Sequence, residues 1–152
     1  IQKRMDFKFR KVRDIQDVFV AGKKFEYLAE RQLSYKDLET LPVMCLEGNT
    51  STRAYVEGFL RENGVHLQPE FELATSDMLI RFAMRGFGIA GVAEDFALEA
   101  MEKGEIFRLH FDREIPKRHF CIVTDEKVPM TAAARRFLNL LEDKCTHDKH
   151  KT

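Results

Sequence analysis

The sequence lacks the features that mark several protein classes. No apolar run approaches the roughly 20 residues that a membrane-spanning helix needs, and the first residues do not resemble a signal peptide with an apolar centre. The 25 basic and 25 acidic side chains cancel to a formal net charge of zero, so no overall basic field attracts nucleic acid or an anionic membrane. Residues 1–13 are an exception, with six basic side chains against Asp6. A solvated strand edge or a frayed terminus accounts for them better than a nucleic-acid-binding arm.

Cysteine is scarce, with only Cys45, Cys121 and Cys145. An odd number at wide, irregular spacing fits a reducing cytoplasm better than a disulfide framework or a zinc site. Cys45 and Cys121 lie inside apolar runs, so we expect both to be buried core residues. The sequence therefore predicts a cytoplasmic protein without a metal site.

Motifs for catalysis are also missing. The sequence contains no HExxH, no P-loop and no G-x-S-x-G. His119 and Cys121 would share one face of a strand, but such a pair is typical of packing. We therefore expect no catalytic residue and no cofactor.

Strand-like and helix-like segments alternate along the chain, which at 152 residues is long enough to bury a core. We expect Ala54 and Phe59 to face the core from one helix, and Ala134 and Phe137 from the last. The expected strands cover residues 12–22, 43–47, 70–74, 88–92, 106–109 and 119–124, and the expected helices residues 51–63, 77–85, 94–103 and 132–144. This order predicts an α/β fold with a largely parallel sheet.

Gly86, Gly88 and Gly91 spell G-x-G-x-x-G, the pattern of dinucleotide-binding loops. In those loops the glycines follow a strand and open a helix, so that the helix N-terminus meets the pyrophosphate. Here the order is reversed, because Gly86 ends an expected helix and Gly88 begins a strand. The pattern therefore indicates a left-handed helix cap and close packing of a buried strand.

Two groups of hydroxyl residues lie between an expected strand and the following helix. Thr50, Ser51 and Thr52 precede or begin one helix, and Thr75 and Ser76 the next. Free backbone N–H groups and the helix dipole favour an anion at such a junction. A plain helix cap needs one hydroxyl residue and not three. The pattern therefore supports two interpretations equally, a ligand crevice at the carboxyl ends of the strands and simple helix capping.

Four stretches together resemble one family. They are LPVMCLEGNTSTR (residues 41–53), residues 69–97 with their G-x-G-I strand, IPKRHFCIVTD (residues 115–125) and AARRFLNLL (residues 133–141). In order and spacing they are similar to the effector-binding domain of LysR-type transcriptional regulators, over about residues 12–142.

The resemblance implies an α/β, type II periplasmic-binding-protein-like fold with two lobes, crossover strands and an incomplete first lobe. Residues 1–22 and 115–145 would form the partial first lobe, residues 23–110 the second lobe, and residues 146–152 a disordered tail. The effector would lie between the lobes. It would contact the hydroxyl residues at both helix starts and one residue of the crossover: Thr50, Ser51, Thr52, Thr75, Ser76 and Phe19.

The sequence departs from the family in lacking an N-terminal helix-turn-helix and the first elements of the first lobe. We therefore expect a truncated domain that reaches DNA only through an absent DNA-binding domain. Phe120, Ile122, Phe137 and Leu141 would lack their usual cover, which predicts a homo-oligomer.

The function implied is that of a ligand sensor, in which a small, anionic metabolite controls transcription without chemistry. A periplasmic-type solute-binding protein is the alternative. An enzyme that uses Cys45 or Cys121 is a third class, which fast alkylation with loss of activity would support.

Overall fold

The computed structural model describes residues 7–147, and their side chains as far as Glu142. The chain divides into two compact units, and each is described by itself. Residues 16–117 form the first, which we call the sheet unit. The segments that precede and follow it form the second, which we call the ribbon unit. The chain passes between the units at the Ile15–Gln16 and Lys117–Arg118 peptide bonds.

A five-stranded sheet forms the centre of the sheet unit, with the strand order β5-β4-β6-β2-β7. The strands are β2 Asp17–Gly22, β4 Val43–Leu46, β5 Phe71–Leu73, β6 Ile89–Ala93 and β7 Ile106–Arg108. β4 is parallel to β5 and β6, whereas β2 is antiparallel to β6 and β7. The expected parallel arrangement therefore holds for every strand of this sheet except β2. Beside it, β3 (Gln32–Leu33) pairs in parallel with β8 (His110–Phe111).

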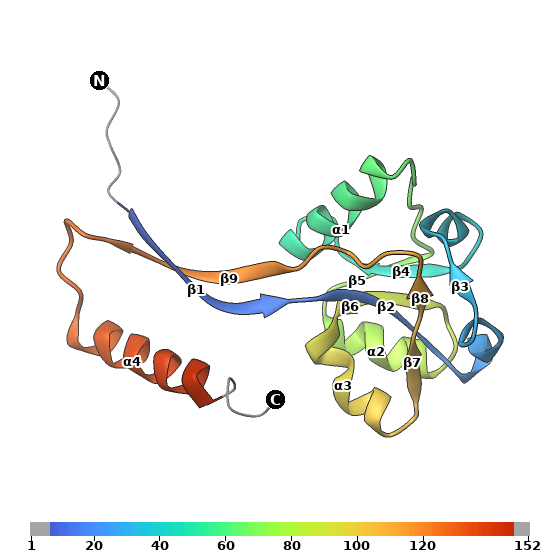
Figure 1. The fold of residues 1–152 in the computed structure, drawn as a ribbon. Coiled ribbons are helices and arrows are strands. Elements are labelled where there is room, and N and C mark those ends of the chain that lie inside the picture. The colour runs from blue at the N-terminus through green and yellow to red at the C-terminus, as the bar shows by residue number, and fades with distance from the viewer. Residues whose placement is uncertain (1–6, 148–152) are drawn as a thin grey trace. The chain divides into compact units, whose positions relative to one another are not determined.

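Helical elements cover both faces of this sheet (Figure 1), because its central strands are apolar on both sides. In β2, Phe19 and Ala21 face one core, and Val18 and Val20 face the other. The helical elements are η1 Lys23–Leu28, η2 Tyr35–Glu39, α1 Ser51–Glu62, α2 Ser76–Met84 and α3 Glu94–Glu102. The 3-10 turns η1 and η2 pack with α1 in the first core, and α2 and α3 pack in the second.

Local signals place the helix ends where the sequence predicts them. Thr50 caps α1, since its hydroxyl accepts a hydrogen bond from the Arg53 backbone N–H at 3.2 Å. Thr75 caps α2 in the same way through the Met78 N–H at 3.3 Å. The glycines that follow α1, α2 and α3 have positive φ angles: Gly64 (71°), Gly86 (76°) and Gly104 (70°).

The glycine triplet is a packing feature, as its order along the chain predicts. Gly86 closes α2 in the left-handed conformation, and β6 begins one residue after Gly88. A Cβ atom on Gly88 would lie 2.6 Å from the carbonyl oxygen of Pro42, and one on Gly91 would lie 3.0 Å from the Phe19 ring. These close approaches explain why glycine stands at both positions.

The ribbon unit consists of two long strands and a helix. β1 (Phe7–Ile15) pairs antiparallel with β9 (Arg118–Asp125), with an irregularity between Lys11 and Arg13. α4 (Ala132–His147) begins after Thr131, whose hydroxyl accepts from the Ala134 N–H at 3.1 Å. β1 is almost wholly exposed, which agrees with the solvated strand edge expected from its basic residues.

Some expectations need correction. The continuous strand expected over residues 12–22 is two strands: the exposed β1 ends at Ile15, and the fully buried β2 is a central strand of the sheet unit. Ala54, Ala134 and Phe137 are exposed, and Phe59 is buried as expected. Cys121 was expected in a core but is exposed, because β9 has a core on neither face. α4 continues through His147, and the rest of the expected disordered tail lies outside the described residues.

Candidate ligand-binding site

Both sets of hydroxyl residues, 50–52 and 75–76, lie at one edge of the sheet. β4 and β5 are parallel neighbours, paired from Met44 with Phe71 to Leu46 with Leu73. The Glu47 backbone N–H extends this pairing by donating to the Leu73 carbonyl at 3.1 Å. Because both strands end there, the caps of α1 and α2 follow at the same edge. The structure thus places residues 50–52 and residues 75–76 at neighbouring strand ends.

The hydroxyls at this edge differ in what they already bind. The Thr50 hydroxyl donates to the Glu47 carbonyl at 3.0 Å and accepts from α1, so capping occupies it. Thr52 is half-buried and has an interaction of its own within the chain. Within the part of the chain that the structure describes, no hydrogen bond engages the hydroxyls of Ser51 and Ser76. These two are the side chains best able to turn toward a ligand.

The electrostatics of the edge favour an anion at α1. Residues 51–54, the first turn of α1, include no acidic side chain, so the positive end of the helix dipole is not neutralised there. The first turn of α2 contains Asp77, and that of α3 contains Glu94 and Asp95. Of these three helix starts, α1 therefore offers the strongest attraction for negative charge.

Arg53 is buried beneath the start of α1, with 7% of its surface exposed. Its Nη1 donates to the Leu46 carbonyl at 3.0 Å and to Glu72 at 2.9 Å, and its Nη2 donates to Glu57 at 2.9 Å. Burial lowers the pKa of Arg53, but the hydrogen bonds to Glu57 and Glu72 outweigh this effect and raise it. Arg53 is not among the site residues expected from the sequence, although Arg53 and Glu57 have the i,i+4 spacing of a helical ion pair.

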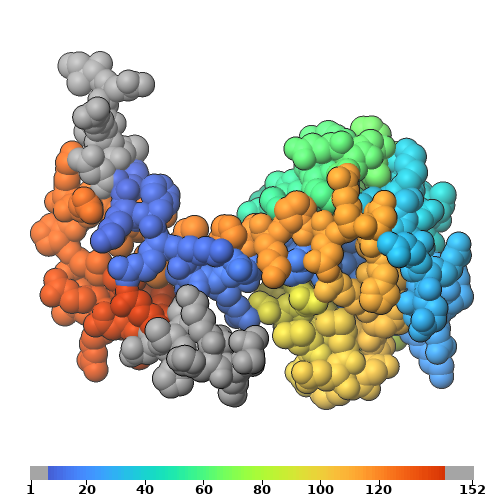
Figure 2. Space-filling view, viewed as in Figure 1, coloured from blue at the N-terminus to red at the C-terminus, as the bar shows by residue number. Residues whose placement is uncertain are grey.

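Phe19 lies apart from the other predicted site residues. It is 1% exposed and lines a cavity of about 200 Å³ inside the sheet unit, edge-on to Phe111 at 5.8 Å between ring centroids. Among the described residues, none of the five hydroxyl residues lines this cavity. The segment of residues 112–117 contributes Arg113, Glu114 and Ile115 to its lining, and in the space-filling view this segment lies at the surface between α1 and α3 (Figure 2).

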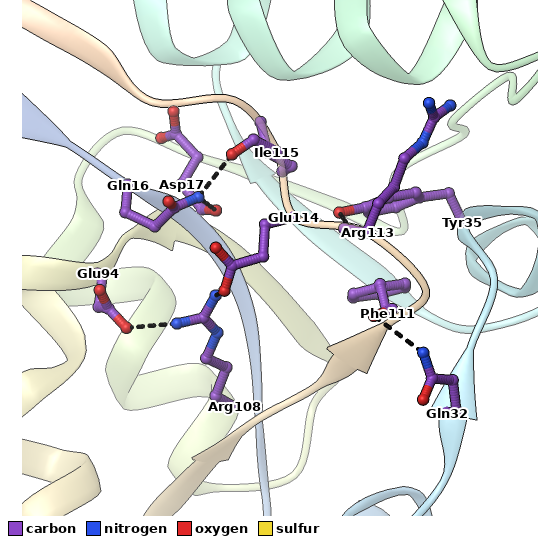
Figure 3. A network of polar contacts seen from close by, with 10 residues as sticks. All are labelled: Gln16, Asp17, Gln32, Tyr35, Glu94, Arg108, Phe111, Arg113, Glu114 and Ile115. Atoms are coloured by element: carbon purple, nitrogen blue, oxygen red, sulfur yellow. Dashed lines mark hydrogen bonds and ion pairs between the residues drawn. The ribbon is translucent and has the colours of Figure 1, made fainter.

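Polar contacts hold the segment of residues 112–117 in place (Figure 3). Arg108 bridges Glu94 at 2.8 Å and Glu114 at 2.7 Å. The Gln16 side-chain amide donates to the Ile115 carbonyl at 2.7 Å. The Tyr35 hydroxyl donates to the Arg113 carbonyl at 2.7 Å. These contacts involve residues of the cavity lining, which also includes Phe19.

The groups considered for catalysis do not assemble. Cys45 is buried, and this burial raises the pKa of its thiol to about 11. His119 Nδ1 lies 2.7 Å from Asp14 Oδ1 in the ribbon unit, so its ring is engaged by a carboxylate. Hydrogen bonds from Lys11 and then His119 lower the pKa of Asp14. No cluster of three or more His, Cys, Asp or Glu side chains suited to a metal ion occurs among the described residues.

A sheet unit with helices on both faces, joined by two chain crossings to a second unit, defines the class of type II periplasmic-binding-protein-like domains. Residues 2–146 match the family model described as the LysR substrate binding domain, and the chain belongs to this family. The family resemblance and the fold class drawn from the sequence are both confirmed. Within residues 7–147, no helix combines the length and apolar character required to cross a membrane.

Solved structures agree with this fold. The regulatory domain of CcmR from Synechocystis PCC6803, in complex with 2-PG, superposes with a TM-score of 0.78 at 16% identity, over 93% of this chain and 68% of that one. The effector binding domain of QuiR, in complex with shikimate, gives 0.76 at 10% identity, over 99% and 69%. The bromide-bound regulatory domain of HypT from Salmonella typhimurium gives 0.72 at 16% identity, over 96% and 68%. No curated protein sequence matches the chain.

Proposed function

We propose that this LysR-type domain senses a small anionic metabolite, which binds at the edge formed by the N-termini of α1 and α2. The observation that carries this proposal is the parallel pairing of β4 with β5, because it directs two hydroxyl-bearing helix starts to one edge of the sheet. Ser51 and Ser76 would donate to the ligand, with support from Thr50, Thr52 and Thr75.

Two further observations support an anion. The first turn of α1 has no acidic residue, so its free N–H groups and dipole attract negative charge. The QuiR domain was solved with shikimate and the HypT domain with bromide, and both of these ligands are anions at neutral pH.

Such a domain acts without chemistry. A ligand favours one arrangement of the intact regulator over another, and it shifts that equilibrium only by the difference in its affinity for the two arrangements. In the proposed regulator this shift passes through a cytoplasmic homo-oligomer to helix-turn-helix domains that bind DNA. The domain itself needs no cofactor and contacts neither DNA nor membrane.

The test is a calorimetric titration of the purified chain with shikimate, inorganic phosphate and the uncharged methyl ester of shikimate. We expect an anion to bind and the ester to bind at least about tenfold more weakly, because hydrogen bonds to a charged group contribute about 1.5–3 kcal/mol. The double variant Ser51→Ala/Ser76→Ala should weaken anion binding by a similar factor.

Thr40→Ala is the matched control, since it removes a hydroxyl from the same unit at the opposite end of β4. Equal binding by the double variant and the control would remove Ser51 and Ser76 from the site. Equal binding of shikimate and its ester would exclude an anion-selective site.

A further inference from the structure

The guanidinium of Arg53 joins β4, β5 and α1, three of the elements that end or begin at the proposed site. Leu46, which accepts from Nη1 at 3.0 Å, is the last residue of β4. Glu72, which accepts from the same nitrogen at 2.9 Å, lies in β5. Glu57, which accepts from Nη2 at 2.9 Å, lies one turn further along α1. One side chain therefore connects β4, β5 and α1 at the edge of the sheet.

Arg53 bonds directly to the cap of α1, and its partner Glu72 leads along the chain to the cap of α2. The backbone N–H of Arg53 donates to the Thr50 hydroxyl, so the residue that supplies the guanidinium also completes the cap of α1. On the other side, Glu72 stands three residues before Thr75, the cap of α2. A displacement of the guanidinium would therefore shift the N-termini of both α1 and α2.

β5 is a short strand at the edge of the sheet. It lies at the end of the strand order, has three residues and, among the described strands, pairs with β4 alone. Its residues are exposed or half-buried, with Leu73 packed against the second core and the Phe71 ring edge-on to Phe82 and Phe87. The contact with Arg53 is an additional tie between this edge strand and α1.

Only arginine suits this position. Its planar fork presents donors in several directions, and three acceptors on three elements are engaged at once. A lysine ammonium is a compact charge on a flexible stem and cannot reach all three with fixed geometry. The Nε donor is buried without an acceptor among the described residues, which costs stability. An apolar side chain would avoid that cost, so stability alone does not explain the guanidinium.

We propose that Arg53, with Glu72 as its partner, is a positioning residue that couples the N-termini of α1 and α2, so that Ser51 and Ser76 can bind one ligand together. This inference rests on the proposed function and adds to it the device that sets the spacing of the two ligand-binding hydroxyls. When the contact with Glu72 is broken, the two helix starts move independently and the site loses affinity while the fold remains.

The test compares Glu72→Gln with Glu70→Gln in the purified chain. Both variants remove one negative charge from the region of β5. Glu70 is exposed, and its backbone N–H donates to the Val43 carbonyl. The readouts are the affinity for shikimate and for inorganic phosphate, and hydrogen exchange at the two cap-bonded amides, those of Arg53 and Met78.

We expect Glu72→Gln to weaken anion binding about tenfold and to speed exchange at both amides, with an unchanged cooperative melt. Glu70→Gln should leave binding and exchange as they are. Glu72→Asp, which keeps the carboxylate, should retain most of the affinity. A purely structural role would instead lower the melting temperature of Glu72→Gln and leave the affinity of the folded chain unchanged.

The failure of this inference can be distinguished from failure of the proposed function. If neither anion binds the unaltered chain but exchange at Arg53 and Met78 still responds to Glu72→Gln, the coupling stands and the ligand assignment falls. If exchange at the Arg53 amide, 19 positions before residue 72, does not respond, the coupling is overturned whatever the binding result.

Discussion

At the scale of single residues, neighbouring hydroxyls at the start of α1 have different tasks. The Thr50 hydroxyl caps the helix and also donates to the Glu47 carbonyl, whereas Ser51 is exposed and its hydroxyl bonds to no described residue. Thr50→Ala should therefore lower the free energy of unfolding by about 1 kcal/mol. Ser51→Ala should change it by less than about 0.5 kcal/mol. Urea unfolding of both variants measures the difference, and equal losses would contradict this division of tasks.

Gly88 stands where the backbone of the loop before β4 passes close to it. An added Cβ would lie 2.6 Å from the Pro42 carbonyl oxygen, which is backbone and cannot turn aside. Gly88→Ala should therefore cost about 1–3 kcal/mol of stability. Gly58 in α1 has no atom within 4 Å of such a Cβ, so Gly58→Ala should gain up to about 1 kcal/mol from helix propensity. A Gly88→Ala variant as stable as the unaltered chain in urea would refute the packing account.

The cysteines should differ in reactivity. The pKa of Cys45 is raised by burial from 9.0 to about 11, while Cys121 is exposed. We expect iodoacetamide at pH 8 to modify Cys121 at least about tenfold faster than Cys45, because only the thiolate reacts. Mass spectrometry of tryptic peptides measures both rates, and the two sites should react alike in urea. Fast labelling of Cys45 in the folded chain would contradict this expectation.

The same shift has a consequence for stability. The Cys45 thiol stays neutral in the folded chain at pH values where it ionises in the unfolded chain. The free energy of unfolding that the neutral thiol contributes is therefore fully present below about pH 9. It is lost as the pH rises toward 11.

At the scale of helices and strands, the sequence predicts elements best where local chemistry decides them. α1, α2 and α3 begin within a residue of the expected positions, and Gly86 caps α2 as expected. These signals act over a few residues, so one sequence is enough to recognise them.

The predictions fail where a distant element decides. The sequence does not show that the chain passes from one unit to the other after Ile15, because β1 and β2 are both strand-like. Cys121 and Phe137 lie in apolar patterns but have no described element packed over them. Arg53 was overlooked because its partner Glu72 is 19 residues away and meets it only through the pairing of β5 with β4.

The exposed aromatic side chains of β9 and α4 predict self-association of the chain. Phe120 is 61% exposed and Phe137 is 63% exposed. We expect Phe120→Ser/Phe137→Ser to shift the chain toward monomer in sedimentation velocity, because burying these rings between copies would be favourable. Phe96→Ser, which removes an exposed ring from α3, is the control. Identical sedimentation of all three proteins would rule out association through β9 and α4.

At the scale of the whole molecule, the central claim is that the edge formed by α1 and α2 binds the ligand. The fold class and the family follow from sequence patterns, since the order of the elements is written along the chain. The site residues depend on which strand ends meet, and the sequence alone does not contain that information. The sheet order shows that the strand ends before residues 50–52 and 75–76 are neighbours. Phe19 lines a cavity that none of these residues lines.

The most direct test of this claim is a nuclear magnetic resonance titration of the ¹⁵N-labelled chain with shikimate and inorganic phosphate. We predict that the largest chemical-shift changes occur at the backbone amides of Ser51, Thr52, Ser76 and Asp77. Changes that centre on Phe19 and Phe111 in the cavity, with none at those four amides, would contradict the claim.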